Sequence, residues 1–180
     1  NIMANTTFDG PVRSKNGFQS IGPGSVIALT AATDLTVADH AGRIVTMDPV
    51  GTPTAITLPT IVATSDGASA GPGSDPNNKS TVGTTFEILF IDEFTGTIST
   101  DGTDKFVGSV MIGVDDGAKK AFVPAAANDV MNLNGEAGAG NATTGGLIGS
   151  RVKFTATADN TYMVEGLLIG DGTIATPFGN

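Results

Sequence analysis

Two short runs near the end of the chain, RVKFTA (Arg151–Ala156) and TYMVE (Thr161–Glu165), decide the fold class. Apolar and polar residues alternate in each run, which is the pattern of a strand with one buried face. Between them, Ala158–Asn160 contains residues that tolerate left-handed backbone geometry. The sequence therefore predicts an antiparallel hairpin of two strands.

The same alternation recurs along the chain. We expect further strands at Ser25–Thr30, Arg43–Asp48, Thr54–Leu58, Thr85–Ile91, Gly96–Thr100, Lys105–Val114, Lys120–Val123 and Gly172–Ala175. Thr85–Ile91 is apolar on one face and partly apolar on the other, which favours a central position in a sheet. No window keeps a helical period for three turns, and Ala125–Met131 fits a short helix or a loop. We predict an all-β protein with a single sandwich or barrel-like domain.

Composition mainly excludes function classes. The chain has 180 residues, which is the size of one domain, and 18 acidic against 9 basic residues, so its net charge is −9. That charge repels the phosphates of nucleic acid. The absence of Cys removes thiolate chemistry, and a single His removes His-rich metal sites. No run approaches the ~20 apolar residues of a membrane span. We expect no enzyme, no cofactor, no metal, no nucleic acid and no membrane.

The first 24 residues differ from the remainder. Residues 1–24 are slightly basic and rich in Gly and Pro, whereas residues 25–180 are acidic and carry the strand patterns. We interpret residues 1–24 as an extended N-terminal arm that binds a partner's surface, with an edge strand of the same domain as the alternative. The candidate contact residues of the arm are Phe8, Val12, Arg13, Lys15 and Phe18.

Residues 64–84 and 134–149 are low in complexity and rich in Gly, Ser, Thr and Asn. We expect both to be long surface loops, where contacts to partners are often made. Charged residues are only 15% of the chain. This low charge fits a surface that meets neighbouring protein, and it equally fits a sandwich with Thr on its exposed strand faces.

Two patterns could indicate nucleophilic catalysis. Gly67–Gly71 matches the G-x-S-x-G turn around Ser69, but it lies within a Gly/Pro/Ser loop, and His40 precedes it instead of following it. Asp39 and His40 could form a base and its orienting carboxylate, although adjacent residues rarely reach that geometry. We expect His40 to be a turn or cap residue.

Acidic pairs raise the possibility of a calcium site or a glycosidase dyad. They are Asp92-Glu93, Asp101/Asp104 and Asp115-Asp116. EF-hand spacing is absent, and Asp-Gly pairs are ordinary turns at strand ends. Incidental calcium binding stays open. One Tyr and no Trp argue against glycoside cleavage and weaken a sugar-binding interpretation.

Five blocks then appear in a familiar order: Leu35–Arg43, Thr54–Pro59, Gly83–Ile88, Gly149–Ala156 and Thr161–Gly166. They resemble the pattern "LT-x2-D-x-G … T-x-T-L-P … G-x-x-F-x-I … G-x-x-V-x-F-x-A … W-x-V-x-G" of small bacteriophage virion proteins. The opening Met3–Ser14 is similar to the start of structural proteins of marine and cyanobacterial tailed phages. Tyr162 stands where the pattern has Trp, and His40 intrudes before Gly42.

The resemblance implies a capsid decoration (cement) protein. Such a protein binds the outer surface of the major capsid protein lattice and stabilises the head, without being an enzyme. The implied partners are the major capsid protein and the chain itself, as a homotrimer, on the exterior of the virion capsid. Two other classes remain open: a head or tail fibre module that binds a host glycan, and a serine hydrolase that uses Ser69 and His40.

Overall fold

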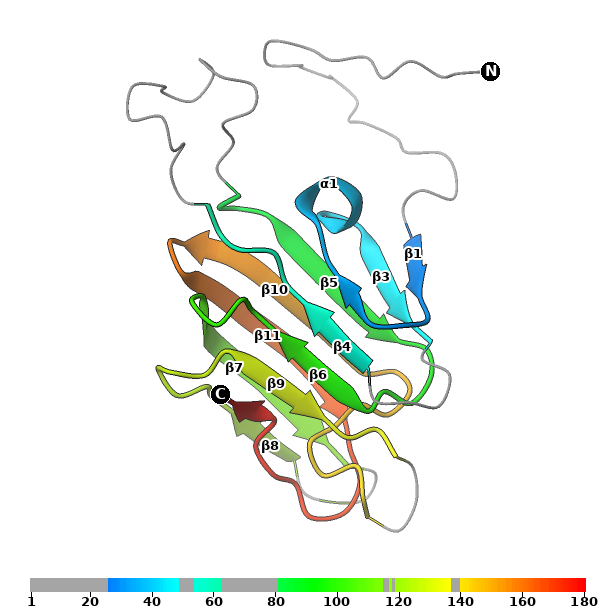
Figure 1. Cartoon of the computed structure of the whole chain (residues 1–180). Helices are drawn as coiled ribbons and strands as arrows, with labels where there is room; N and C mark the ends of the chain where they lie inside the picture. The colour runs from blue at the N-terminus through cyan, green and yellow to red at the C-terminus, as the bar shows by residue number, and fades with distance from the viewer. Residues whose placement is uncertain (1–25, 49–53, 63–80, 115–116, 118, 137–139) are drawn as a thin grey trace, which may run out of the picture.

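The computed structural model describes residues 26–48, 54–62, 81–114, 117, 119–136 and 140–180. These residues form two mixed β-sheets that pack face to face as a sandwich (Figure 1). One helical turn, α1 (Val37–His40), lies at one end of the sandwich. The predicted all-β class with a sandwich-like domain is confirmed.

The larger sheet has seven strands. In spatial order they are β1 (Val26–Leu29), β3 (Ile44–Met47), β5 (Thr85–Phe90), β10 (Arg151–Ala158), β11 (Thr161–Ile169), β7 (Lys105–Gly113) and β8 (Lys119–Phe122). β1, β3 and β5 run parallel, as do β11 and β7. The pairs β5–β10, β10–β11 and β7–β8 are antiparallel. β5 is thus a central strand, as its two-sided apolar pattern predicts.

The smaller sheet has five strands. Their order is β12 (Phe178–Gly179), β9 (Val130–Leu133), β6 (Gly96–Ser99), β4 (Thr54–Thr57) and β2 (Thr33–Asp34). The chain alternates between the two sheets from β1 to β7, so β2, β4 and β6 also run parallel to one another. The antiparallel pairs β6–β9 and β9–β12 complete the sheet.

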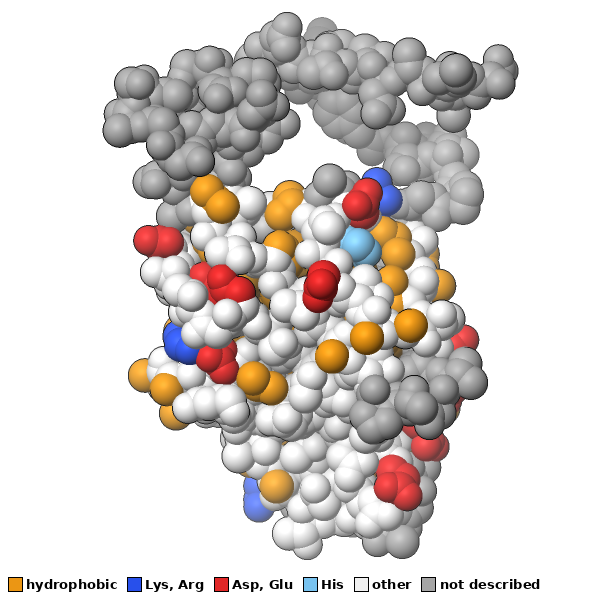
Figure 2. Space-filling model, in the orientation of Figure 1, with side chains coloured by type: hydrophobic (Ala, Val, Ile, Leu, Met, Phe, Trp, Pro, Cys, Tyr) orange, Lys and Arg blue, Asp and Glu red, His pale blue; other side chains and the backbone are white. Residues whose placement is uncertain are grey.

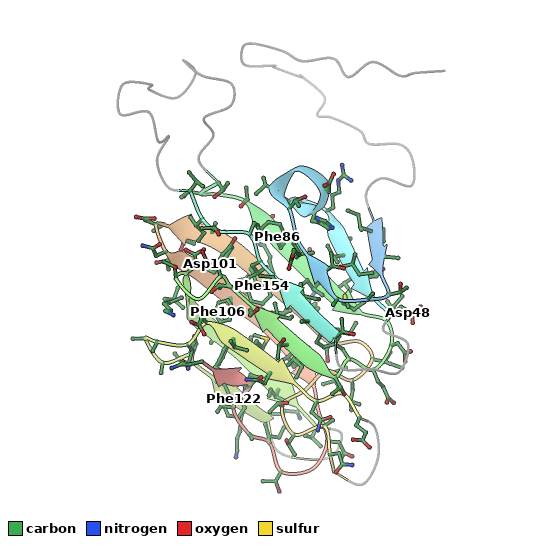
Figure 3. The ribbon with its side chains drawn as sticks, viewed as in Figure 1. Asp48, Phe86, Asp101, Phe106, Phe122 and Phe154 are labelled. Atoms are coloured by element: carbon green, nitrogen blue, oxygen red, sulfur yellow. The ribbon has the colours of Figure 1, made fainter. Side chains whose placement is uncertain are left out.

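Large side chains from both sheets fill the space between them. Phe86, Phe106 and Phe154 come from the seven-stranded sheet and are fully buried (Figure 3). Phe154 is in register with Phe86, and its ring centroid lies 5.4 Å from that of Phe106. Ile56 and Ile98 approach from the five-stranded sheet and are equally buried. Burial of such apolar area is the main favourable contribution to folding.

The hairpin predicted from Arg151–Glu165 is present as β10 and β11. Arg151 pairs with Leu167, and the register runs through Phe154 and Val164. Asn160 has φ 54°, which is the left-handed conformation that a tight turn requires and that Asn tolerates. β11 continues four residues beyond the predicted end of the strand, to Ile169.

Several expected elements differ in the structure. Gly172–Ala175 is not a strand, and Ala125–Met131 forms a turn that leads into β9. Strands β2 and β12 have two residues each, too few to show a periodic pattern, so only their sheet neighbours define them. Strand β9 buries Met131 and Leu133, and the expectation of a helix or loop at Ala125–Met131 missed it. Helix α1 is a single turn, which gives no periodic signal either.

The described part of residues 134–149 is a loop, as expected, but it does not lie wholly on the surface. Gly135, Ala142, Gly145 and Gly146 are buried. The Gly146 carbonyl accepts a hydrogen bond from the Phe94 N–H at 2.8 Å. The segment closes one end of the sandwich because its small residues allow close backbone contact. Of the other predicted loop, residues 64–80 lie outside the described residues, as does the arm, residues 1–24.

Candidate functional site

The outer face of the seven-stranded sheet carries many exposed apolar side chains. Twelve large hydrophobic side chains of the described residues are about a third or more exposed. Seven of them belong to strands of this sheet and none to strands of the five-stranded sheet. The seven are Val26, Ile44, Val107, Met111, Met163, Leu167 and Ile169. An apolar surface gathered on one face indicates a site of interaction with another protein.

The strand registers arrange this face in rows across the sheet. An apolar row contains Ala28, Thr46, Leu89, Arg151, Leu167, Met111 and Ala121. Beside it, a charged row contains Val26, Ile44, Glu87, Lys153, Glu165 and Ser109. All these residues point outward because each alternates with a core residue on its strand.

The centre of the charged row is an ion pair. Lys153 Nζ lies 3.3 Å from Glu165 Oε1, and both side chains are about half exposed. Such a pair contributes little to stability in water. A shallow hollow of about 460 Å³ opens at this point, lined among others by Glu87, Arg151 and Leu167. The centre of the face therefore combines apolar side chains with two cations, Arg151 and Lys153, and two anions, Glu87 and Glu165.

The opposite face of the sandwich has a different chemistry. Figure 2 looks onto the five-stranded sheet, where white atoms dominate over β4, β6 and β9. The outward residues there are small or polar, for example Ala55, Thr97 and Asn132. The asymmetry between the two faces identifies the outer face of the seven-stranded sheet as the candidate interaction site.

His40 is the last residue of the helical turn α1, which agrees with the expectation of a turn or cap residue. Its Nδ1 accepts a hydrogen bond from the Thr36 N–H at 3.0 Å. The Thr36 hydroxyl accepts a hydrogen bond from the Asp39 N–H and donates one to the Asp39 carboxylate. Thr36 is thus the N-cap of α1, and its hydroxyl gives the Asp39 N–H of the first turn a hydrogen-bond partner. The imidazole nitrogen that faces Thr36 serves this local structure. The G-x-S-x-G pattern at Gly67–Gly71 lies outside the described residues.

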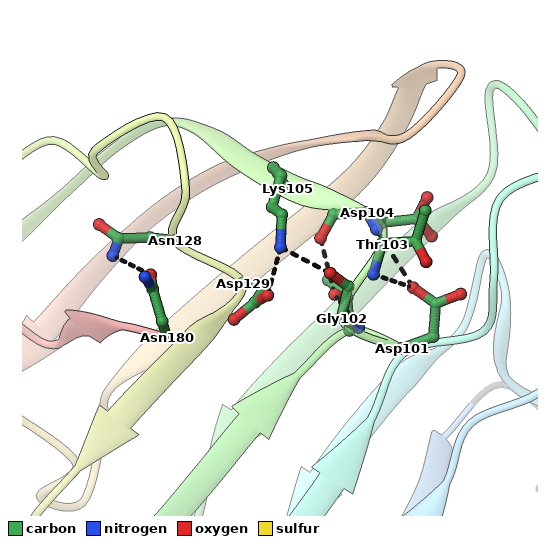
Figure 4. Close-up of polar contacts among 9 residues, drawn as sticks. Asp101, Gly102, Thr103, Asp104, Lys105, Asn128, Asp129 and Asn180 are labelled. Carbon is green, nitrogen blue, oxygen red and sulfur yellow. Dashed lines mark hydrogen bonds and ion pairs between the residues drawn. The ribbon is translucent and has the colours of Figure 1, made fainter.

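Asp101 forms a turn that begins just after β6 (Figure 4). Its Oδ1 accepts hydrogen bonds from the N–H groups of Thr103 and Asp104 at 2.9 and 3.1 Å. Its Oδ2 accepts one from the Thr60 hydroxyl at 2.9 Å. Burial alone would raise the pKa of Asp101, but these hydrogen bonds outweigh burial and lower it. The Asp-Gly turn at a strand end is therefore confirmed.

Asp104 is fully buried in the same corner. Its Oδ2 accepts a hydrogen bond from the Ile61 N–H at 2.9 Å, and its Oδ1 has no hydrogen-bond partner. Burial raises the pKa of Asp104; the Ile61 N–H opposes the rise, and the charges of Asp101 and Asp159 add to it. Beside it, Lys105 forms an ion pair with Asp129 and donates to the Gly102 carbonyl (Figure 4). These contacts are structural: Asp101 closes the turn after β6, Asp104 holds the segment that follows β4, and Lys105 joins β7 to Asp129 just before β9.

The remaining sequence-predicted sites are as follows. Asp92 accepts a hydrogen bond from the Glu93 N–H, an ordinary turn contact. Asp115 and Asp116 lie outside the described residues, and so do the arm residues Phe8, Val12, Arg13, Lys15 and Phe18. Within the described part of the chain, no three His, Asp or Glu side chains are grouped so that they could hold a metal ion.

Sequence reasoning missed the candidate face. Alternation alone assigns the outward positions of β7 and β11 to the polar side of ordinary strands, although Val107, Met111, Met163 and Leu167 are all apolar. The signal that could have found the face is this double-sided apolar pattern, which β5 shares. No match was found among protein-family models, curated proteins or solved structures. None of the helices in the described ranges is long and apolar enough to cross a membrane.

Proposed function

We propose that the chain is a non-enzymatic structural protein of a bacteriophage virion, a decoration protein that binds the outer surface of the capsid lattice. The single structural observation in support is the apolar outer face of the seven-stranded sheet. A decoration protein acts by burying its own surface against other proteins, so that opening the shell must break additional contacts. A standard interface of ~1,600 Å² per copy, repeated over a lattice, is sufficient for this role.

The proposal includes two protein contacts, one made by the N-terminal arm and one made by the outer face of the seven-stranded sheet. The N-terminal arm, residues 1–24, binds the major capsid protein through its spaced apolar and basic residues. A folded β-domain with its own interaction face is held at the particle surface by that arm. The resemblance to virion proteins supplies the identity of the partner, and the homotrimer that it implies remains a prediction.

The alternative is a fibre or receptor-binding module that recognises a host glycan. Glycan sites usually use exposed aromatic rings as stacking platforms. Of the described aromatic side chains, Tyr162 and six Phe are buried, and Phe122 is half-buried. The described surface therefore favours a protein contact over a sugar contact.

The decisive experiment measures the copy number of the chain relative to the major capsid protein, by quantitative mass spectrometry of gradient-purified particles. A near-stoichiometric ratio is expected for a decoration protein. A few copies per particle would instead indicate a fibre, and absence from the particle would refute the virion role. Deletion of residues 1–24 should leave the domain folded, by circular dichroism, and abolish particle binding.

A further inference from the structure

The outer face of the seven-stranded sheet has the size of a standard protein interface. Seven strands about 4.8 Å apart span about 29 Å, and the long central strands extend about 26–30 Å at about 3.3 Å per residue. Because the edge strands β1 and β8 are only four residues long, the face covers about 700 Å² in projection, close to the ~800 Å² that each partner contributes to a stable complex. One partner can cover the apolar row and the charged row together.

We propose that this face binds the same face of a second copy of the chain, around a two-fold axis that runs parallel to the strands between β10 and β11. Around this axis β10 faces the partner's β11, and β5 faces the partner's β7. Homo-oligomers most often form through such self-complementary contacts. The inference concerns the chain in solution. It gives the face that supports the proposed function a second copy as its occupant and leaves the N-terminal arm as the capsid contact.

The charged row selects this axis. With the axis between β10 and β11, Lys153 of each copy faces Glu165 of the other, which places opposite charges together twice. An axis through β10 would place the two copies of Lys153 against each other, and an axis through β11 would do the same for Glu165. An axis between β5 and β10 would pair Lys153 with Glu87 but would set the Glu165 carboxylate against the apolar Ile44. A two-fold axis perpendicular to the strands along this row also places like charges together. Like charges in a contact oppose association.

The apolar row fits the same axis. Leu89 on β5 then faces Met111 on the partner's β7, so two apolar side chains meet. Leu167 on β11 faces Arg151 on the partner's β10, whose aliphatic part can pack on leucine while its guanidinium reaches solvent. On the charged row, Glu87 faces Ser109, so no anion meets another anion. Aligned packing of two sheets at ~10 Å separation suits this arrangement.

A three-fold arrangement would use the face differently. In a homotrimer, each contact joins two different patches of the chain. This face would then bind another part of the molecule, and the match of the face with itself would not be used. The proposed pairing therefore predicts a dimer where the resemblance implies a trimer. Sedimentation velocity and light scattering of the full chain at micromolar concentrations distinguish the two. A trimer or a monomer would overturn the proposal.

Variants locate the contact. Leu167→Lys places a new cation opposite Arg151 of the partner and should weaken the dimer more than about tenfold. The matched control is Ala55→Lys, an exposed mid-strand change on the five-stranded sheet, which should leave the dimer intact. Circular dichroism verifies that both variants fold. An unchanged dimer in folded Leu167→Lys would contradict the proposed face.

A mixing experiment tests the axis itself. Lys153→Glu places two carboxylates at the centre of the face, and Glu165→Lys places two ammonium groups there, so each variant alone should be monomeric. Mixed together, the two variants should form a one-to-one heterodimer, because every central contact then joins opposite charges. Native mass spectrometry resolves the heterodimer. Failure of the mixture to associate, or dimers of either variant alone, would contradict this axis.

The outcome is separable from that of the virion proposal. A dimer that is absent from particles would refute the virion role alone. A monomer or trimer found at high copy number on particles would refute the two-fold pairing alone.

Discussion

The hydroxyl of Tyr162 on β11 donates a hydrogen bond to the carbonyl of Pro59 at 2.6 Å, although 103 positions separate the two residues. Pro59 follows β4 of the five-stranded sheet, so this bond joins the two layers of the sandwich. The ring of Tyr162 is buried among core side chains. The resemblance pattern has Trp at this position, and the tyrosine hydroxyl supplies this polar link between the layers.

Removal of that hydroxyl should destabilise the fold modestly. Tyr162→Phe keeps the ring and leaves the Pro59 carbonyl without this donor, so we expect a loss of about 1–2 kcal/mol in the free energy of unfolding. Urea denaturation followed by circular dichroism measures it. The control is Thr161→Val, which removes an exposed hydrogen bond to the Asp159 carbonyl and should change stability by less than about 0.5 kcal/mol.

The same tyrosine should resist ionisation. Burial raises the pKa of Tyr162 far above its ordinary value, and the negative charges of Asp104 and Asp101 add to the effect. Because the chain contains one Tyr and no Trp, ultraviolet absorbance of the phenolate reports this residue alone. We expect the phenolate to appear only when alkali unfolds the protein. Smooth ionisation near pH ~10 in folded protein would contradict the buried placement.

Asp104 should make stability fall as pH rises. Its pKa is raised in the folded state, so the folded chain binds this proton more tightly than the unfolded chain. The contribution of Asp104 to the free energy of unfolding is then greatest below the ordinary aspartate pKa of about 4, and it is lost as pH rises through the higher folded pKa. Asp104→Asn should remove this loss. Urea titrations at several pH values, compared with the original chain, measure the difference in slope.

Asp101 should act in the opposite sense. Its pKa is lowered in the folded state, so its contribution is present above about pH 4 and is lost as pH falls through the lower folded value. Asp101→Asn can keep the turn, because the amide oxygen still accepts the two N–H bonds. This variant should therefore flatten the acid side of the profile. If the free energy of unfolding of Asp101→Asn and of Asp104→Asn changed with pH in the same way, the opposite pKa shifts of the two carboxylates would be contradicted.

Replacement of Gly108 on β7 by any other residue should destabilise the fold. Its φ is +105°, and a Cβ at this position would clash with the Val164 carbonyl oxygen on β11. Gly108→Ala combines backbone strain with a clash between paired strands, so we expect a loss of about 3 kcal/mol in stability. Gly113→Ala on the same strand is the control, since a Cβ there contacts nothing within 4 Å. Thermal unfolding of both variants measures the contrast.

Alternation in the sequence predicted much of the fold. A strand points alternate residues to opposite sides. The alternation of apolar and polar residues therefore predicted the hairpin β10–β11, the central strand β5 and the inward direction of Phe86 and Phe154. Strands β2 and β12 could not be predicted, since two residues carry too little periodic signal and depend on their neighbours for hydrogen bonds.

The candidate site shows the same division. The turn roles of His40 and Asp101 were predictable, because their hydrogen bonds are made within four positions along the chain. The burial of Asp104 was not, since it depends on Ile61, 43 positions away, to cover the carboxylate.

Alternation along each strand indicates which of its sides can be buried, because alternation is a local property of the chain. That Leu89, Arg151, Leu167 and Met111 share one row follows from how the strands pair. Strand order is set by long-range pairing between β5, β10, β11 and β7, and no local pattern encodes it. The outer face therefore exists only once the strands have assembled, and its chemistry is a property of the sheet and not of any one segment.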